Sequence, residues 1–536
     1  MAERGRADRK GITPAQWVKI RKVSQVVFFI IFLVLFFWSR REFYLNPSLE
    51  SGIKEKLVNI PLKLDPLVMI AQAIASRRVI RGSLLALFTL VLSFFLGRVW
   101  CGWFCPMGTI LEWIPIRSWK KNKPKIPEGF RAIKYVLLMV ILFSAIFTNL
   151  TLLFLDPLTI GYRTLTTAIW PGLDQVVTSV ELSLIQIPFL SSAVGAFDSL
   201  IRPAIFPAHP AVYRYGLLYL GFFLAIVGLN ALAPRFWCRY LCPLGGLFGL
   251  LGKVSLLGCE VTSSCTTCGS CLPDCPTGAI QEGDGVFCDP GECTMCMVCL
   301  DSCPANSVKF PFKMTKFLHQ PYDIGRRNAL LSVGATAVGL GLLKTDFLGQ
   351  VEAPTPIRPP GVVNLRLLET CIRCGECSTV CPTNAIQMAV LDGGVEGFWT
   401  PVVVPRIGYC DYSCQACGQV CPVEAIPPLS LEEKRVQIMG RAHVDRDRCL
   451  PWAENQECIV CEEMCPVPDK AIELELVLVQ DEEGGVKTLQ RPVVIRDLCI
   501  GCGICENKCP ASGEAAIRIH VPSGGNQHGF HHRGRR

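Results

Sequence analysis

Hydrophobic positions divide the chain into two unlike parts. Four apolar runs of roughly membrane-spanning length lie within the first 258 residues, at 23–38, 83–100, 132–155 and 212–233. From residue 259 onward, short polar and apolar segments alternate around closely spaced cysteines. This pattern predicts an α-helical membrane bundle of four spans followed by small α+β domains.

Basic residues orient the predicted bundle. The arm up to residue 22 carries seven Lys and Arg residues, and the connection 117–134 carries seven more. The long connection 156–213 carries only Arg163 and Arg202. Because basic loops stay on the cytoplasmic side, we expect a protein of the bacterial inner membrane with its N-terminus in the cytoplasm. Residues 39–82 contain eight basic residues and disagree with this layout.

An eleven-residue pattern occurs twice in the bundle, as RVWCGWFCPMG at 98–108 and RFWCRYLCPLG at 235–245. This duplication predicts two related halves. One interpretation is a redox centre or a quinol-proximal site at the membrane surface, and the other is a structural turn that anchors a helix end. The residues concerned are Cys101, Cys105, Cys238 and Cys242, together with Arg98, Trp100, Arg235 and Trp237.

Six cysteine quartets follow, and each ends in Cys-Pro. They are Cys265, Cys268, Cys271 and Cys275; Cys293, Cys296, Cys299 and Cys303; Cys371, Cys374, Cys377 and Cys381; Cys410, Cys414, Cys417 and Cys421; Cys449, Cys458, Cys461 and Cys465; and Cys499, Cys502, Cys505 and Cys509. A small residue and then a branched one follow each Cys-Pro, at 279–280, 307–308, 385–386, 425–426, 471–472 and 516–517. We expect these pairs to pack against the bound metal group.

This spacing predicts six [4Fe–4S] clusters. Three cysteines bind one cluster and the fourth, before Pro, binds the neighbouring cluster. Zinc sites show two separated cysteine pairs instead. The first two quartets pair with each other, whereas the last four can pair as neighbours or nested. Cys259 and Cys288 are left over and are expected to be ordinary buried thiols.

A second targeting signal lies in mid-chain. Arg326 and Arg327 precede a mildly apolar run at 328–343 and a Pro-rich linker. This is typical of a twin-arginine export signal, and the run is either a fifth span or a hairpin on the cytoplasmic side. The predicted domains are 1–258 (membrane), 259–318 (two clusters), 319–360 (signal and linker) and 361–536 (four clusters, periplasmic).

Composition narrows the function. Of 536 residues, 50% are hydrophobic and 18% charged, below the ~25% charged residues of soluble proteins. The formal charge of +8 comes without a basic block that would bind nucleic acid. No P-loop or dinucleotide-binding fingerprint occurs. No haem is expected, because the first part has a single histidine, His209, and no C-x-x-C-H motif occurs.

These motifs resemble a known pair joined end to end. Residues 1–318 resemble NapH-type membrane ferredoxin proteins of periplasmic nitrate reductase systems, and residues 319–536 resemble NapG-type polyferredoxins, with methylamine-utilisation (MauM) ferredoxins built similarly. The departures are the fusion itself and the eight-residue gap after Cys449.

The resemblance implies a quinol dehydrogenase that passes electrons from the quinone pool to a periplasmic reductase or multihaem cytochrome. The alternatives are electron entry from a periplasmic dehydrogenase into quinone, an assembly factor, or a wiring subunit of a larger respiratory complex.

Overall fold

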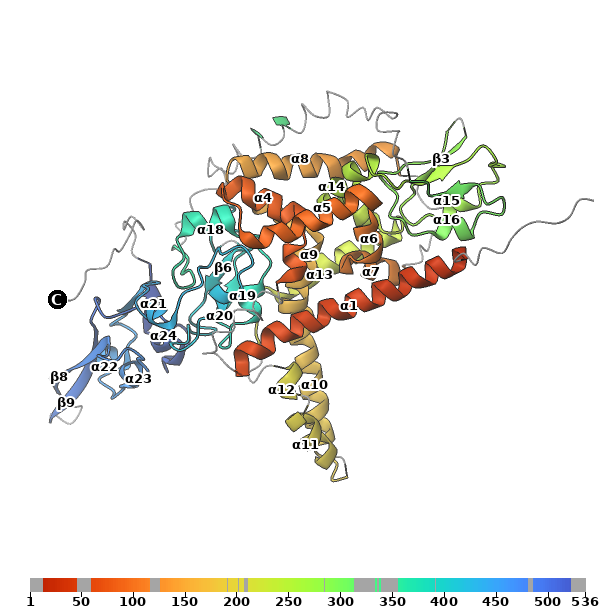
Figure 1. Ribbon diagram of the computed structural model, residues 1–536. Coiled ribbons are helices and arrows are strands. Elements are labelled where there is room, and N and C mark those ends of the chain that lie inside the picture. Colours follow the sequence, from red (N-terminus) through yellow and green to blue (C-terminus); the bar gives the residue numbers. More distant parts are fainter. Residues whose placement is uncertain are drawn as a thin grey trace, which may run out of the picture.

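A computed structural model describes residues 13–45, 59–115, 126–189, 191–200, 202–206, 211–283, 285–312, 333–334, 337–338, 355–390, 392–480 and 485–521. A helical bundle occupies the middle, and small cysteine-rich domains lie at its two opposite ends (Figure 1). The main helices of the bundle are α1 (Pro14–Leu45), α4 (Pro66–Ser76), α5 (Leu84–Leu96), α6 (Val99–Trp103), α7 (Pro106–Trp113), α8 (Ile133–Ile146), α9 (Pro157–Thr164), α13 (Gly216–Gly228) and α14 (Pro243–Lys253).

Short elements connect these helices. They are α3 (Ile60–Lys63), η1 (Arg81–Ser83), η2 (Glu128–Ala132), η3 (Thr151–Leu155), η4 (Leu165–Ile169), η5 (Leu229–Ala231) and η6 (Trp237–Leu241). In addition, α10 (Trp170–Leu184), α11 (Ser191–Leu200) and α12 (Arg202–Ile205) project from the bundle (Figure 1).

Two of the four predicted spans lie in helices long and apolar enough to cross a membrane, Pro14–Trp38 and Gly129–Ile146. The other two fall on α5 and α13, which have only 13 residues each. At 1.5 Å per residue such a helix is about 20 Å long, short of the ~30 Å hydrocarbon core. The four-span layout therefore stays a prediction. Most of the run 328–343 lies outside the described residues.

The helices of each half are interrupted, and one interruption falls at the same position of the duplicated pattern in both halves. Gly97, at φ 65°, ends α5. Cys105 and Cys242 then adopt the same extended backbone (φ −67°, ψ 118° and φ −70°, ψ 112°), and Pro106 and Pro243 start α7 and α14. A residue before proline is pushed out of the helical region, and proline suits the first helical position. Each half thus contains a broken helix with a cysteine at the break.

The repeat extends further than its cysteine motif. Asp65 precedes Pro66 at the start of α4, and Asp156 precedes Pro157 at the start of α9. Each carboxylate accepts two backbone N–H groups of its own helix, and the two side chains contact each other inside the bundle. Each half therefore runs from an Asp-Pro helix through an apolar helix to a Cys-Pro break.

The halves are interlocked. Helix α14 of the second half packs against α5 of the first, and α7 packs against α9. The Arg98 guanidinium donates to the Cys238 carbonyl at 3.5 Å, and Arg235 donates to the Gly108 carbonyl at 3.0 Å. Each motif's arginine therefore reaches the other motif.

The cysteine-rich part forms three domains built from paired short strands and single-turn helices. At one end of the bundle lie β1 (Glu260–Val261), α15 (Cys271–Asp274), β2 (Ile280–Glu282), β3 (Val286–Cys288), α16 (Val298–Asp301) and β4 (Val308–Lys309), with β1 antiparallel to β4 and β2 antiparallel to β3.

The other two domains follow each other beyond the opposite end (Figure 1). The nearer contains α18 (Asn364–Thr370), α19 (Glu376–Thr379), β5 (Ile386–Met388), β6 (Pro401–Val403), α20 (Ala416–Gln419) and α21 (Leu431–Arg435). The outer contains β7 (Arg441–Val444), α22 (Leu450–Ala453), α23 (Val460–Glu463), β8 (Ile472–Gln480), β9 (Val486–Val494), α24 (Ile504–Lys508) and β10 (Ile517–His520). Strand β5 pairs with β6, β7 with β10 and β8 with β9, all antiparallel. Multiple ferredoxin-like domains are therefore present, as the sequence predicts.

A close backbone contact docks the first cysteine-rich domain on the bundle. Gly102, inside the first duplicated motif, faces the carbonyl of Thr294, and a Cβ there would collide with it. The Trp103 indole N–H donates to the Met295 carbonyl at 2.9 Å. The loop that carries Cys293 and Cys296 thus lies directly against Gly102 and Trp103.

Gly102→Ala tests this contact. The added Cβ should push the 293–296 loop away and cost about 1–3 kcal/mol, as overpacking does. We expect an earlier thermal loss of iron–sulfur absorbance in detergent. Gly221→Ala is the matched control, because a Cβ at Gly221 in α13 has open space. Equal midpoints for the two variants would contradict the contact.

Candidate metal centres

The quartets come together in pairs that exchange their fourth cysteine. Four cavities of about 300–380 Å³ are each lined by three cysteines of one motif and the fourth of its neighbour. The sets are Cys265, Cys268, Cys271 with Cys303; Cys293, Cys296, Cys299 with Cys275; Cys449, Cys458, Cys461 with Cys509; and Cys499, Cys502, Cys505 with Cys465. The fifth motif therefore pairs with the sixth despite its long first gap.

The third and fourth motifs pair in the same way. Cys421 lies close enough to Cys371 to interact electrostatically with it, and it also acts on Cys374 and Cys377. Cys381 acts in turn on Cys414 and Cys417. The pairing left open by the sequence is therefore between neighbours and not nested.

The pair of residues after each Cys-Pro has two different roles. In five motifs the backbone N–H of the small residue donates to the sulfur of the fourth cysteine at 3.2–3.4 Å, from Ala279, Ser307, Ala425, Ala471 and Ala516. The branched residue that follows is buried in all six motifs, as expected: Ile280, Val308, Ile386, Ile426, Ile472 and Ile517. The small residue supplies a hydrogen bond to sulfur, and the branched residue shields the cavity.

Iron fits these cavities by donor chemistry. Burial is the main cause that raises the pKa of Cys296, Cys414 and Cys461 to about 12. Cluster iron binds the thiolate, so binding has to displace the thiol proton, which thiophilic iron does. Four cysteine sulfurs around one apolar space are the donor set of a [4Fe–4S] cluster.

The sites follow one another in a line. Cys410 in the nearer domain donates its N–H to the Cys502 carbonyl of the outer domain at 2.8 Å. The set containing Cys449 lies beyond the set containing Cys499, at the outer end of the chain of sites (Figure 1). On the other side of the bundle, the loop between Cys293 and Cys296 contacts α6 through Gly102 and Trp103.

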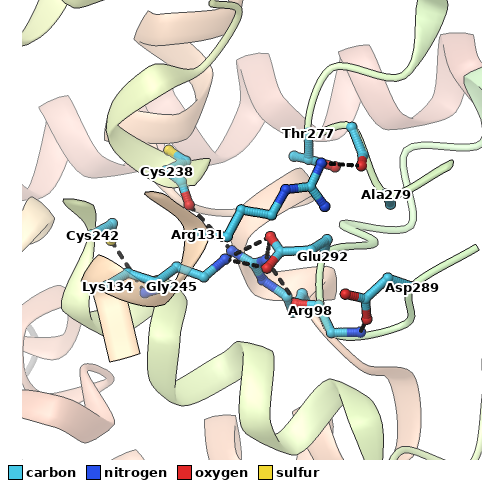
Figure 2. Close-up of polar contacts among 12 residues, drawn as sticks. Arg98, Arg131, Lys134, Cys238, Cys242, Gly245, Thr277, Ala279, Asp289 and Glu292 are labelled. Atoms are coloured by element: carbon cyan, nitrogen blue, oxygen red, sulfur yellow. Dashed lines mark hydrogen bonds and ion pairs between the residues drawn. The ribbon is translucent and has the colours of Figure 1, made fainter. Parts of the chain in front are cut away.

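An ion triad joins the first cluster domain to the bundle. Glu292, next to Cys293, lies between Lys134 at 2.6 Å and Arg98 at 3.1 Å, and all three side chains are at most 3% exposed (Figure 2). Burial alone would raise the pKa of the Glu292 carboxyl, but Lys134 and Arg98 outweigh it and hold the pKa below its ordinary value. Arg131 adds a hydrogen bond to the Gly278 carbonyl at 2.9 Å. Sequence reasoning missed Glu292, because nothing local distinguishes it from a surface glutamate.

The four cysteines of the duplicated motifs come together in the core of the bundle. Cys105, Cys238 and Cys242 are buried, and Cys101 is partly buried and acts electrostatically on all three. No group of three among them has sulfurs as close as 4.8 Å. The apolar core that contains these thiols continues without interruption to Cys371 and Cys374 in the nearer domain.

The tryptophans and arginines of the motifs differ in their bonding. Arg235 pairs with Glu112 at 2.7 Å, and Arg21 shares that carboxylate at 2.6 Å. The indole N–H groups of Trp100 and Trp237 are buried and have no hydrogen-bond partner among the described residues. Each arginine therefore has a carboxylate partner, although Nε of Arg98 and Nε and Nη1 of Arg235 lack a hydrogen-bond partner among the described residues, as the two indole N–H groups do.

At the far end of the bundle, Arg163 connects to the nearer domain. Its guanidinium donates to the Arg373 carbonyl at 2.8 Å and lies 3.7 Å from the centre of the Trp399 ring. Arg373 sits between Cys371 and Cys374, and its backbone N–H donates to the Cys371 sulfur at 3.4 Å. Helices at both ends thus contact a loop that carries cluster cysteines.

Comparisons with known proteins agree with this chemistry. A 4Fe-4S binding domain family matches residues 79–124 and 215–258, which contain the two duplicated motifs. A 4Fe-4S dicluster domain family matches residues 370–425, the third and fourth motifs, and a further 4Fe-4S binding domain family matches residues 492–512. The fold, the cysteine sets and these matches define an iron–sulfur electron-transfer protein with several 4Fe-4S domains.

Curated relatives give the family. Ferredoxin-type protein NapG of Escherichia coli (strain K12) is 33% identical over 219 residues, which cover 39% of this chain and 91% of that protein. Methylamine utilization ferredoxin-type protein MauM of Methylobacillus flagellatus is 34% identical over 193 residues, covering 35% and 78%. The chain belongs to this NapG/MauM family of ferredoxin-type proteins through that segment. No solved structure matches it.

Double variants test the exchanged fourth cysteine. Cys421→Ser and Cys374→Ser serve one site in this structure, so the double variant should lose no more iron than either single variant, about four atoms per chain. Cys421→Ser with Cys414→Ser should lose about eight, because two clusters are affected. Iron analysis of anaerobically purified protein measures both. Losses of about eight iron atoms in both double variants would support nested pairing, and the reverse order would mean that each motif keeps its own fourth cysteine.

Proposed function

We propose that the chain is a membrane-anchored electron conduit that oxidises quinol and passes single electrons through six [4Fe–4S] clusters to a periplasmic reductase. In this proposal residues 1–318 act as a NapH-type membrane part and residues 319–536 as the NapG-type part. Each cluster is held by the exchanged cysteine sets, and the protein supplies hydrogen bonds to sulfur and an apolar shield.

One observation carries the proposal. The cluster domains lie at opposite ends of the helical bundle, docked through Glu292 at one end and Arg163 at the other. An electron path through the whole chain of sites has to cross the bundle. If the cluster domains lay on the same side of the bundle, electrons could pass between them without crossing it.

In this proposal quinol binds beside Trp100 and Trp237. Trp100 and Trp237 are 7% and 4% exposed, and their unpartnered indole N–H groups belong to the motifs that hold the four thiols. A quinol oxygen would accept such a hydrogen bond. Electrons that leave quinol singly need acceptors close by, and the loop with Cys293 lies against Gly102.

The expected topology favours outward electron flow. In this topology the N-terminus lies in the cytoplasm and the outer domains lie in the periplasm. Moving one electron outward is then favourable by about 2.3 kcal/mol per 100 mV of inside-negative membrane potential. The names of the NapG and MauM relatives describe ferredoxin-type proteins, and MauM is named for methylamine utilization. A dehydrogenase that feeds quinone is the second candidate, in which the same path runs inward.

Quinol-driven bleaching tests the proposal. Anaerobically purified full-length protein in detergent should lose iron–sulfur absorbance when a menaquinol analogue is added. Trp100→Phe and Trp237→Phe keep an aromatic ring and remove the N–H, so each should slow this bleaching about fivefold, the effect of losing a hydrogen bond worth about 1 kcal/mol.

The control is Trp113→Phe, because Trp113 is 44% exposed and outside both motifs. Dithionite should bleach all variants equally. If quinol fails to bleach the wild-type protein while dithionite succeeds, the chain wires electrons or assists assembly without oxidising quinol.

A further inference from the structure

Two cysteines outside the quartets lie beside one cluster site. The sulfur atoms of Cys259, Cys288 and the ligand Cys293 all lie within 4.8 Å of one another. Cys259 also makes hydrogen-bond contacts with Cys288, Cys293 and Cys299. Both extra thiols are buried, at 4% and 9% exposure, and both line the cavity of Cys275, Cys293, Cys296 and Cys299. This cavity therefore contains six cysteines where four suffice.

The outer domain shows what normally occupies the position of Cys288. Ile280 pairs with Cys288 across β2 and β3, and the corresponding Ile472 pairs with Val494 across β8 and β9. Each isoleucine directly follows the small residue whose N–H bonds the fourth cysteine. Val494 is therefore the counterpart of Cys288.

Cys259 has an equally clear counterpart. Val261 pairs with Val308 in the first cluster domain, and Val444 pairs with Ile517 at the equivalent position of the outer domain. Cys259 lies two residues before Val261, and Ala442 lies two residues before Val444. Ala442 lines the cavity of Cys499 and donates its N–H to the Cys499 sulfur at 3.4 Å. The equivalent site of the outer domain, which contains Cys499, therefore has Ala442 and Val494 at the two positions where this site has thiols. We call it the sibling site.

We propose that Cys259 and Cys288 are a built-in thiol pair that donates S–H hydrogen bonds to the Cys293 sulfur and raises the reduction potential of the cluster held by Cys275, Cys293, Cys296 and Cys299. A thiol that binds no metal keeps its proton in apolar surroundings, here Ala279, Ile280 and Phe310. Hydrogen bonds to cluster sulfurs favour the reduced, more negative cluster.

Buried charge near the same site acts in the same direction. Arg98 and Lys134 bring two positive charges and Glu292 one negative charge, all buried next to Cys293. When the cluster gains one electron, no bond forms or breaks and both thiol protons stay on their sulfurs. This site, which faces the bundle, is thereby tuned to accept and hold an electron. The proposal depends on the cluster and not on quinol.

A double variant converts the site into its sibling. Cys259→Ala with Cys288→Val reproduces the Ala442 and Val494 arrangement in the full-length protein. In an EPR-monitored redox titration with chemical mediators, one cluster component should become about tenfold harder to reduce, which is 59 mV for a one-electron couple. The iron content should stay at the wild-type value.

The reciprocal exchange guards against a folding artefact. Ala442→Cys with Val494→Cys should make the Cys499 component easier to reduce by a similar factor. Cys259→Ser, which keeps a hydrogen-bond donor, should shift the potential less than Cys259→Ala. An unchanged potential in the first double variant would overturn the proposal, and so would a loss of about four iron atoms, which would make the two cysteines ligands. Since quinol is absent, failure here is distinct from failure of quinol oxidation.

Discussion

The exchanged fourth cysteine is the constraint on which the cysteine-rich part depends. A motif such as the one at Cys371 cannot complete its own site, because its fourth sulfur, Cys381, belongs to the neighbouring set. Two motifs have to fold together, so their sites lie close to each other. With strands of only two to nine residues, these domains have few other means of fixing the spacing. Metal binding is therefore also the main source of their folding energy.

Sequence reasoning predicted the cysteine sets well because their chemistry is local. Spacing and the following proline identify each ligand without knowledge of the fold. Spacing could not predict how the last four motifs pair, because Cys421 and Cys371 are distant in sequence and come together only in the folded chain. The expected burial of residues such as Ile280 is confirmed, whereas the hydrogen bond from Ala279 to sulfur needed coordinates.

The bundle was harder to predict, because hydropathy shows how apolar a segment is and not whether one continuous helix forms along it. The runs at 83–100 and 212–233 are predominantly apolar, yet the helices inside them end at Leu96 and Gly228. The extension of the repeat to Asp65 and Asp156 also escaped notice. An insertion carrying α10, α11 and α12 separates Asp156 from its cysteine motif, so the two motifs keep a constant offset of 137 residues while the aspartates do not.

Glu292 of the first cluster domain pairs with Arg98, whereas the equivalent arginine of the second motif, Arg235, pairs with a carboxylate of the bundle. The residue that follows Gly108 by four positions is Glu112, which neutralises Arg235 from within the bundle. The matching residue of the second half is Gly249, where a Cβ would lie 3.1 Å from the Gly291 carbonyl. Arg98 therefore has no carboxylate inside the bundle, and the open helix surface admits the 290–292 loop. Glu292 then supplies the missing charge. This residue difference between the halves thus accompanies the docking of the first cluster domain at Arg98.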